Sequence, residues 1–152
     1  MLVGEQPGDQ EDRAGTPFIG PAGQVLDRAL DEAGIDRKET YVTNAVKHFK
    51  WKPRGPRRIH DKPSWSEQLA CRPWLDAELA VVKPEVLILL GATAAQTLLG
   101  RSFRVARDRG HVAHSDLAKT VIATIHPSAI LRSSDRDEMF RSLVVDLALA
   151  SR

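Results

Sequence analysis

Short apolar runs alternate along the chain with longer segments in which apolar residues recur every three or four positions. Residues 86–90 are continuously apolar and partly β-branched, and residues 120–125 form a second such run that includes two threonines; both are typical of strands covered on both faces. Residues 1–3 and 41–46 predict two further strands, and the chain opens in the last residues of the first of these. The pattern therefore predicts four strands.

Helices are predicted between these strands. One covers residues 21–33, because Pro21 suits a first helical turn and Gly34 suits a helix end. Another opens at Ser64, which forms a capping-box pattern with Glu67. The apolar positions that these two helices carry are Val25, Leu26, Ala29, Leu30, Leu69, Pro73, Leu75, Leu79 and Val82, with Pro73 as an early kink.

Two more helices are predicted, over residues 92–99 and from about 135 to 150. The second of these places Met139, Leu143, Val144 and Leu147 on one face. Strands that alternate with helices indicate an α/β fold. We therefore expect a three-layer α/β/α sandwich with a largely parallel central sheet, formed as a single domain by residues 1–152.

Composition narrows the class of protein. The chain has 152 residues, of which 42% are hydrophobic and 28% charged. These values are typical of one globular domain and exclude disordered, collagen-like and membrane-spanning classes. A single cysteine forms no internal disulfide, and no signal segment opens the chain, so the expected location is the cytoplasm.

Positive charge is concentrated in one segment. The whole chain carries +2, but residues 47–62 contain seven Lys and Arg against one acid, Asp61. Three prolines and a glycine within residues 47–63 disfavour both a helix and a central strand, so we expect a long exposed loop. A basic loop on a nearly neutral body indicates an anionic partner, with nucleic acid the first candidate.

Polar clusters follow all four predicted strands, at residues 5–12, at residues 44–60, from Gly91 onward and at residues 126–128. Ligands of open α/β sheets bind beyond the carboxyl ends of the strands, so these clusters are expected to meet. No dinucleotide or P-loop glycine motif is present. Taken singly, these features also have ordinary structural explanations. Residues 5–12 fit a solvated acidic loop, and residues 126–128 fit a strand-ending turn. Phe18 fits a staple residue before a helix, and His60 fits an exposed loop histidine.

Five motifs occur in one order along nearly the whole chain: GEQPGDQED (4–12), GTPFIGPAG (15–23), YVTNAVK (41–47), VLILLGATAA (86–95) and HPSAILR (126–132). Together they resemble the family 4 branch of the uracil-DNA glycosylase superfamily, whose members are DNA-repair enzymes. The exact sequence of the first motif and the insertion ending in RRIH (57–60) resemble those of the UdgX subgroup. The resemblance implies the uracil-DNA glycosylase fold, a uracil-containing DNA substrate, no membrane partner and a monomer.

The resemblance also implies roles for residues of the motifs. Phe18 would stack on a uracil flipped out of the DNA, and Asn44 would read its edge. His126 would stabilise the departing base, while Gln6 and its backbone neighbours hold it. Glu5 would assist the reaction at the sugar carbon C1′. The remaining candidates are Asp9 as a further catalytic acid, and Asp12 and Ser128 as substrate-binding residues.

His60 carries the most specific expectation. UdgX members excise uracil and stay covalently attached to the DNA through a histidine of this loop, which implies that role for His60. A neutral imidazole is a good nucleophile near neutral pH. Arg57 and Arg58 would meet phosphates, and Pro56 stands where the subgroup has lysine, which puts the crosslinking rate in question. The alternatives are an ordinary family 4 enzyme that turns over, or a non-catalytic DNA-binding remnant.

The family also implies a 4Fe–4S cluster. Cys71 matches the last cysteine ligand, and His48 stands at the position of the third, but the chain has no CxxC motif. A cubane cluster needs four ligands, and only these two candidates are present. The resemblance therefore implies that the N-terminal part of the domain, with the CxxC and most of the first strand, is missing before Met1. Without a cluster, Cys71 would be a buried core thiol.

Overall fold

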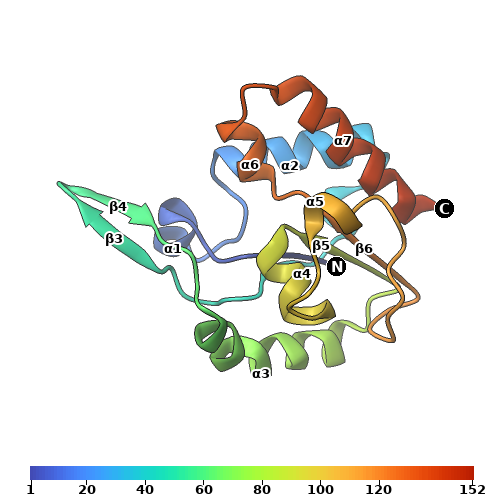
Figure 1. The fold of residues 1–152 in the computed structure, drawn as a ribbon, viewed down its shortest axis with the longest axis horizontal. Coiled ribbons are helices and arrows are strands. Elements are labelled where there is room, and N and C mark those ends of the chain that lie inside the picture. Colours follow the sequence, from blue (N-terminus) through green and yellow to red (C-terminus); the bar gives the residue numbers. More distant parts are fainter.

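The computed structural model describes residues 1–152 and contains a four-stranded parallel sheet (Figure 1). The strands run β1 (Leu2–Gly4), β2 (Val42–Asn44), β5 (Val86–Leu90) and β6 (Thr120–Thr124), in the spatial order β2-β1-β5-β6. The α/β prediction with a parallel central sheet is confirmed. All four expected strands are present, although β2 is shorter than the predicted segment 41–46.

Helices cover both faces of the sheet because successive strand residues point to opposite sides. Ile88 and Leu90 of β5 pack with α2 (Pro21–Glu32) and α7 (Arg136–Ala148), whereas Leu87 and Leu89 pack toward α3 (Trp65–Val82) and α4 (Ala92–Leu99). The shorter helices are α5 (Val105–Asp108), α6 (Pro127–Arg132), and the 3-10 turns η1 (Arg37–Glu39) and η2 (Leu149–Ser151). None of the helices is long and apolar enough to span a lipid bilayer.

The four predicted helices are confirmed with small differences at their ends. Helix α3 begins with the predicted capping box, in which Ser64 accepts from the Glu67 amide and the Glu67 side chain accepts from the Ser64 amide. It continues without a break through Pro73. Leu75 of this helix is fully buried, but Leu69 is 48% exposed, so the apolar character of Leu69 does not mark a core position.

The prediction of a long loop over residues 47–63 was wrong. The chain forms an antiparallel hairpin of β3 (Trp51–Arg54) and β4 (Arg57–His60), joined by a two-residue turn. Gly55 has a φ of +59°, and Pro56 supplies the negative φ that follows, a combination that closes tight hairpins. Pro53 is tolerated within β3 because both strands of the hairpin are edge strands.

The acidic segment after β1 was also expected to be a loop, but it includes the short helix α1 (Asp9–Ala14). Three acids in its first turn interact favourably with the positive end of the helix dipole, and Gly15 closes the helix with a left-handed φ of +72°. His126 is the N-cap residue of α6, so the fourth polar cluster, at residues 126–128, starts a helix rather than a simple turn.

Strand β2 lies on one side of β1, and β5 and β6 lie on the other side. The direction in which strands are added to the sheet therefore reverses between β1 and β5. The segments that leave the carboxyl ends of these two strands diverge, and such a switch point opens a crevice in parallel sheets. This edge of the sheet carries the candidate site.

The loop before α2 depends on a glycine. A Cβ added at Gly23 would lie 2.0 Å from the Phe18 carbonyl oxygen, a contact that only a backbone shift relieves. We expect Gly23→Ala to lower the free energy of unfolding by about 2 kcal/mol or more, measured by urea denaturation. Gln24→Ala, on the exposed side of the same helix, should change it by less than about 0.5 kcal/mol. Equal stabilities of the two variants would contradict the packing of this loop.

Candidate active site

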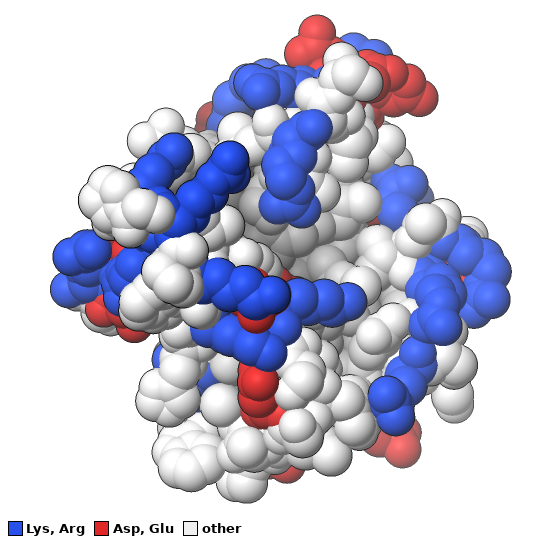
Figure 2. All heavy atoms as spheres, turned by 60° about the vertical axis from the view of Figure 1, so that its left-hand side comes forward, with Lys and Arg blue, Asp and Glu red and all other residues white.

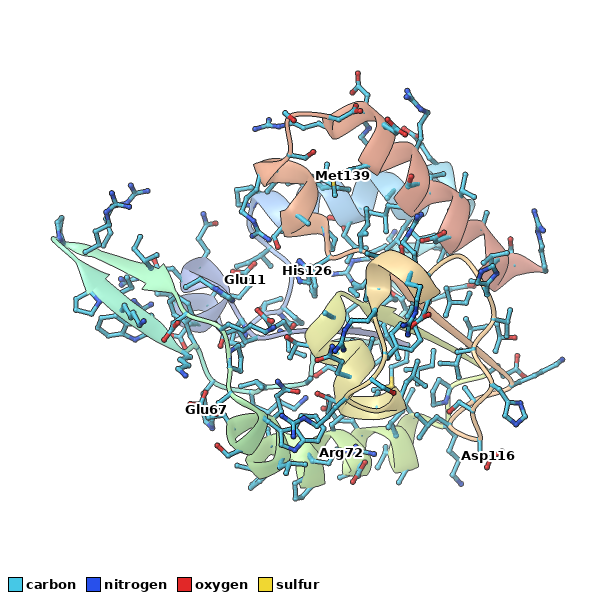
Figure 3. The ribbon with its side chains drawn as sticks, viewed as in Figure 1. Glu11, Glu67, Arg72, Asp116, His126 and Met139 are labelled. Atoms are coloured by element: carbon cyan, nitrogen blue, oxygen red, sulfur yellow. The ribbon has the colours of Figure 1, made fainter.

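A pocket of about 620 Å³ opens at the carboxyl edge of the sheet, where all four polar clusters meet. His126 and Glu11 approach it from different elements, as Figure 3 shows. The lining side chains that can stack, form hydrogen bonds or take part in acid–base chemistry include Glu5, Phe18, Asn44, His60, His126 and Ser128. The predicted convergence of the four clusters is therefore confirmed.

Glu5 lies directly after β1 and links two sides of the pocket. Its Oε1 is 2.7 Å from the His60 Nε2, and its Oε2 accepts a hydrogen bond from the Thr93 hydroxyl. Burial by itself would raise the pKa of Glu5, but the hydrogen bonds with His60 and Thr93 outweigh it and leave the pKa below the ordinary 4.5. The carboxylate is therefore ionised at neutral pH.

His126 is held in one orientation. Its Nδ1 accepts from the Ser128 backbone N–H at 3.0 Å, and the Ser128 Oγ is 2.8 Å away. Because a backbone N–H can only donate, the proton of the neutral ring is on Nε2. Burial lowers the pKa of His126 to about 4, so the ring is neutral at physiological pH.

Phe18 provides an apolar surface beside this imidazole. The two rings are stacked, with centroids 5.6 Å apart and an interplanar angle of 29°. Phe18 is 7% exposed and has a φ of +54°, a strained conformation for a non-glycine residue. Gly4 makes room for it, since a Cβ there would lie 2.7 Å from the Phe18 Cζ and 2.6 Å from the Asn44 Oδ1.

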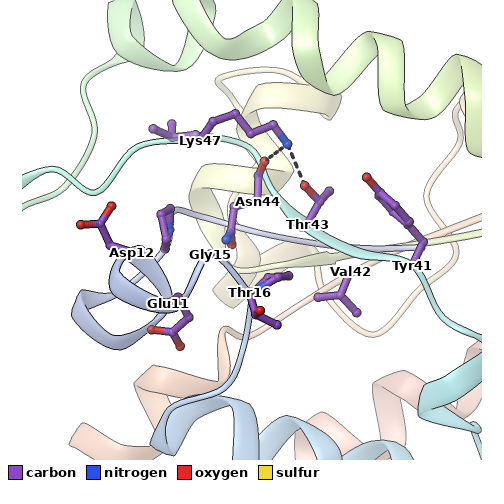
Figure 4. Close-up of a pocket in the computed structure, with 12 residues that line it drawn as sticks. Glu11, Asp12, Gly15, Thr16, Tyr41, Val42, Thr43, Asn44 and Lys47 are labelled. Atoms are coloured by element: carbon purple, nitrogen blue, oxygen red, sulfur yellow. Dashed lines mark hydrogen bonds between the residues drawn. The ribbon is translucent and has the colours of Figure 1, made fainter.

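Asn44, at the end of β2, is the one buried side chain with an unpaired polar atom. It is 7% exposed, and its Oδ1 has no hydrogen-bond partner. Its backbone carbonyl, in contrast, accepts from the Lys47 Nζ at 2.7 Å (Figure 4). A buried acceptor without a partner costs about 1–3 kcal/mol, and such a cost is typical of a group that a ligand completes.

A second, smaller pocket of about 310 Å³ lies on the other side of Asn44 (Figure 4). Two of its lining side chains, Lys47 and Tyr41, both bind Glu78 of α3 and form a cluster with it. The hydrogen bond to Glu78 raises the pKa of Tyr41 to about 12. This cluster ties β2 to α3 and so fixes the strand that presents Asn44.

Gln6 closes the base of the hairpin. Its Nε2 donates to the carbonyls of Lys50 and Asp61 at 3.0 and 3.2 Å, and its Oε1 accepts from the Lys50 amide at 3.0 Å. The side-chain amide was expected to hold the base, but these three bonds occupy it. Only the backbone of Gln6 is therefore available to contact a ligand in the pocket.

Arg58 also has a different place from the one expected. Its guanidinium binds Asp9 at 2.5 Å and Asp12 at 2.9 Å and lies over the rings of Phe49 and Trp51. Neither Asp9 nor Asp12 lines the main pocket. The three residues form an ion-pair cluster that fastens the hairpin to α1, so they do not present acids to the pocket or a free cation to phosphates. Arg57 is exposed and forms no ion pair.

The motifs did not single out every pocket residue. Thr93, Lys62 and Arg132 line the main pocket without a predicted role. Thr93 could have been predicted from the sequence, because it follows Gly91 at the carboxyl end of β5, where the other candidate residues also lie. Arg132 donates to the Ser128 Oγ at 3.3 Å, so it extends the network around His126.

The candidate metal ligands do not form a metal site. Cys71 is buried on α3, where its Sγ accepts from the Lys47 amide at 3.5 Å, and His48 is exposed. The structure contains no group of three or more His, Cys, Asp or Glu side chains that could hold a metal ion. The residues of this chain therefore do not fit a four-ligand iron–sulfur cluster.

The fold and pocket together define an α/β protein with its binding site at the switch point of a parallel sheet. The family model "Uracil DNA glycosylase superfamily" matches residues 1–148, and the chain belongs to this superfamily. The resemblance to family 4 is supported by relatives at 33–36% identity.

Three such relatives are named type-4 uracil-DNA glycosylase. The protein of Thermotoga maritima is 36% identical over 151 residues, which cover 99% of this chain and 74% of that protein. The protein of Pyrobaculum aerophilum is 36% identical, covering 87% of this chain and 67% of its own length. The protein of Archaeoglobus fulgidus is 33% identical, covering 93% and 71%. Membership of the UdgX subgroup stays a prediction.

The environment of His126 makes stability depend on pH. The unfolded ring takes up a proton near its ordinary pKa of 6.5, but the folded ring does so only near 4. Between these values the unfolded state binds more protons, so stability falls as the pH falls from about 6.5 to about 4. We expect this part of the acid destabilisation, roughly 2–3 kcal/mol, to vanish in His126→Gln, measured by urea denaturation across that range.

A matched change at an exposed histidine, His111→Gln, should leave the wild-type pH dependence in place. If His126→Gln and the wild type lost the same stability on acidification, the folded His126 ring would titrate normally and its assigned neutral state would be wrong.

Proposed function

We propose that this protein excises uracil from DNA by breaking the bond between the base and the sugar carbon C1′. The observation that carries the proposal is the Asn44 side chain, a buried amide without a protein partner next to the apolar face of Phe18. A flipped pyrimidine needs both features, a ring surface for stacking and a hydrogen-bonding group at its edge. Membership of the superfamily and the type-4 names of the relatives support the same reaction.

Asn44 explains a preference for uracil over cytosine. Its Oδ1 accepts from the uracil N3–H, and its Nδ2 donates to the uracil O4. Cytosine presents an acceptor at N3 and a donor at N4, so both contacts become repulsive. A mispaired buried amide costs a few kcal/mol, which is enough for strong selection.

His126 acts on the leaving base. Breaking the bond leaves negative charge on uracil, and the Nε2–H of a neutral imidazole donates to the uracil O2 where this charge develops. The two contacts from Ser128 to Nδ1 hold the ring so that this proton faces outward. The low pKa suits this role because it keeps the ring neutral, while the bond from the Ser128 amide fixes the tautomer.

Glu5 acts on the sugar. The sugar becomes positively charged as the base departs, and an ionised carboxylate nearby stabilises that charge. Its ionisation is maintained by His60 and Thr93 despite partial burial. The catalytic set is then Glu5 for the cationic fragment and His126 for the anionic one.

We propose further that His60 captures the sugar covalently. When the ring is neutral, the Nε2 that faces the Glu5 carboxylate carries the proton, and the lone pair is on Nδ1. The electron pair of the C1′–N1 bond leaves with uracil, and the Nδ1 lone pair forms a new bond to C1′. The resulting imidazolium loses its Nε2 proton through Glu5 to solvent, and the uracil anion takes up a proton on release.

Replacing Asn44 by leucine, which has a similar shape, separates recognition from folding. We expect uracil release to fall by about 100-fold because the edge contacts are lost. The free energy of unfolding should not fall, since the unpaired buried acceptor disappears with the amide. Uracil release from a labelled oligonucleotide and urea denaturation measure the two effects. The control is Gln24→Leu at an exposed amide, and wild-type release by Asn44→Leu would refute the assigned role.

Covalent capture is tested with a labelled uracil oligonucleotide on a denaturing gel, beside a thymine control. We expect a uracil-dependent protein–DNA band that survives SDS and heat, its loss in His60→Ser, and continued uracil release by that variant. His111→Ser should keep the band. Alkali-labile cleavage without a band would indicate an ordinary glycosylase that turns over. Binding without any base release would indicate a non-catalytic DNA-binding protein.

A further inference from the structure

The β3–β4 hairpin has two chemically different faces. Residues that face each other across an antiparallel pair share a side, and successive pairs alternate. The pairs Trp51–His60 and Pro53–Arg58 therefore lie on one face, which we call the inner face. The pairs Lys52–Ile59 and Arg54–Arg57 lie on the other, which we call the outer face.

The inner face is committed to the protein. His60 contacts Glu5 at 2.7 Å, and Arg58 binds Asp9 and Asp12 of α1. These contacts fix the orientation of the hairpin, so the outer face is turned away from α1. The hairpin projects from the body of the molecule in Figure 1.

The outer face presents cations that the protein does not neutralise. Arg54 and Arg57 are exposed and form no hydrogen bond or ion pair, and Lys52 has only a 3.7 Å contact with Asp61. Figure 2 shows Lys and Arg side chains gathered around a hollow on the side of the molecule from which the hairpin projects. Lys62 and Arg132 line the main pocket itself.

Arg54 and Arg57 are also direct cross-strand partners. Like charges directly opposite each other destabilise a strand pair. The hairpin therefore carries a local electrostatic cost that a polyanion bound to this face would remove. This repulsion is an observation independent of exposure, and it favours an anionic ligand with closely spaced charges.

We infer that the outer face of the hairpin, with Lys52, Arg54 and Arg57, binds the phosphates of the DNA backbone beside the nucleotide held in the pocket. The inference rests on the proposed function for the identity of the polyanion. The contacts are independent of sequence and add affinity rather than selection for uracil. One hairpin then serves two tasks, since its inner face carries His60 to the pocket and its outer face holds the strand.

The salt dependence of DNA binding tests the inference. Binding of a fluorescein-labelled thymine oligonucleotide is measured by anisotropy over a range of salt concentrations. For Arg54→Gln/Arg57→Gln we expect weaker binding and a plot of log K against log salt that is shallower by about 1.4–1.8, because each lost phosphate contact removes about 0.7–0.9. The control Lys38→Gln/Lys119→Gln removes equal charge just before β2 and β6, at the amino ends of the strands and away from the pocket, and should keep the wild-type slope. Equal slopes for the two double variants would overturn the inference.

A charge reversal distinguishes phosphate binding from damage to the hairpin. Arg57→Glu places an opposite charge across from Arg54, so the thermal midpoint should not fall while DNA affinity falls further than with glutamine. A lower midpoint together with lower affinity would mean that the arginine acts through folding, which overturns the inference.

Uracil release by the wild type keeps this inference apart from the proposed function. If the wild type releases uracil and the slope is unchanged in Arg54→Gln/Arg57→Gln, only the hairpin inference fails. If the slope changes as expected and the wild type releases no uracil, the hairpin binds DNA and the proposed function fails.

Discussion

The pairing of β1 with both β2 and β5 is the constraint on which the candidate site depends. In this central position β1 places Glu5 next to Asn44 at the end of β2 and opposite Thr93 after β5. The strand is only three residues long, so it owes its place to burial: Leu2 and Val3 are at most 1% exposed and point into the two opposite cores. Packing on both faces of one short strand thus sets the relative positions of the carboxylate, the amide and the threonine.

The hairpin is the second element that the site needs, and polar contacts rather than a core hold it. Gln6 binds both ends of the hairpin, and Arg58 joins it to α1 through Asp9 and Asp12. Exposed ion pairs contribute little when isolated, but a guanidinium bound by two carboxylates and covered by two aromatic rings is a network with fixed geometry. The acids of the first motif therefore divide their work: Glu5 faces the pocket, and Asp9 and Asp12 position the segment that delivers His60.

Most of the fold could be predicted from the sequence because its signals are local. The run 86–90 is apolar throughout, the run 120–125 is interrupted only by Thr120 and Thr124, and Gly34 and Ser64 mark helix boundaries. Helix α1 was missed because none of its residues is buried, so no apolar period reveals it. The sequence also pointed to the pocket residues, but not to which of Arg57 and Arg58 faces inward. That depends on hairpin register, since neighbouring strand residues take opposite faces and Arg58 finds its partners on α1, 46 and 49 positions away.

The two histidines of the pocket show that environment, rather than residue type, decides a role. His126 is partly buried, stacked on Phe18 and fixed by Ser128 through Nδ1, so it keeps one neutral tautomer and can only offer its Nε2–H. His60 lies on the rim with half of its side chain exposed, and its Nε2 is engaged by Glu5, so the free nitrogen is on the other side of the ring. In the proposed reaction, the partly buried ring with a committed acceptor stabilises the leaving anion, the exposed ring with a free lone pair forms the bond to the sugar, and the ionised Glu5 supports both.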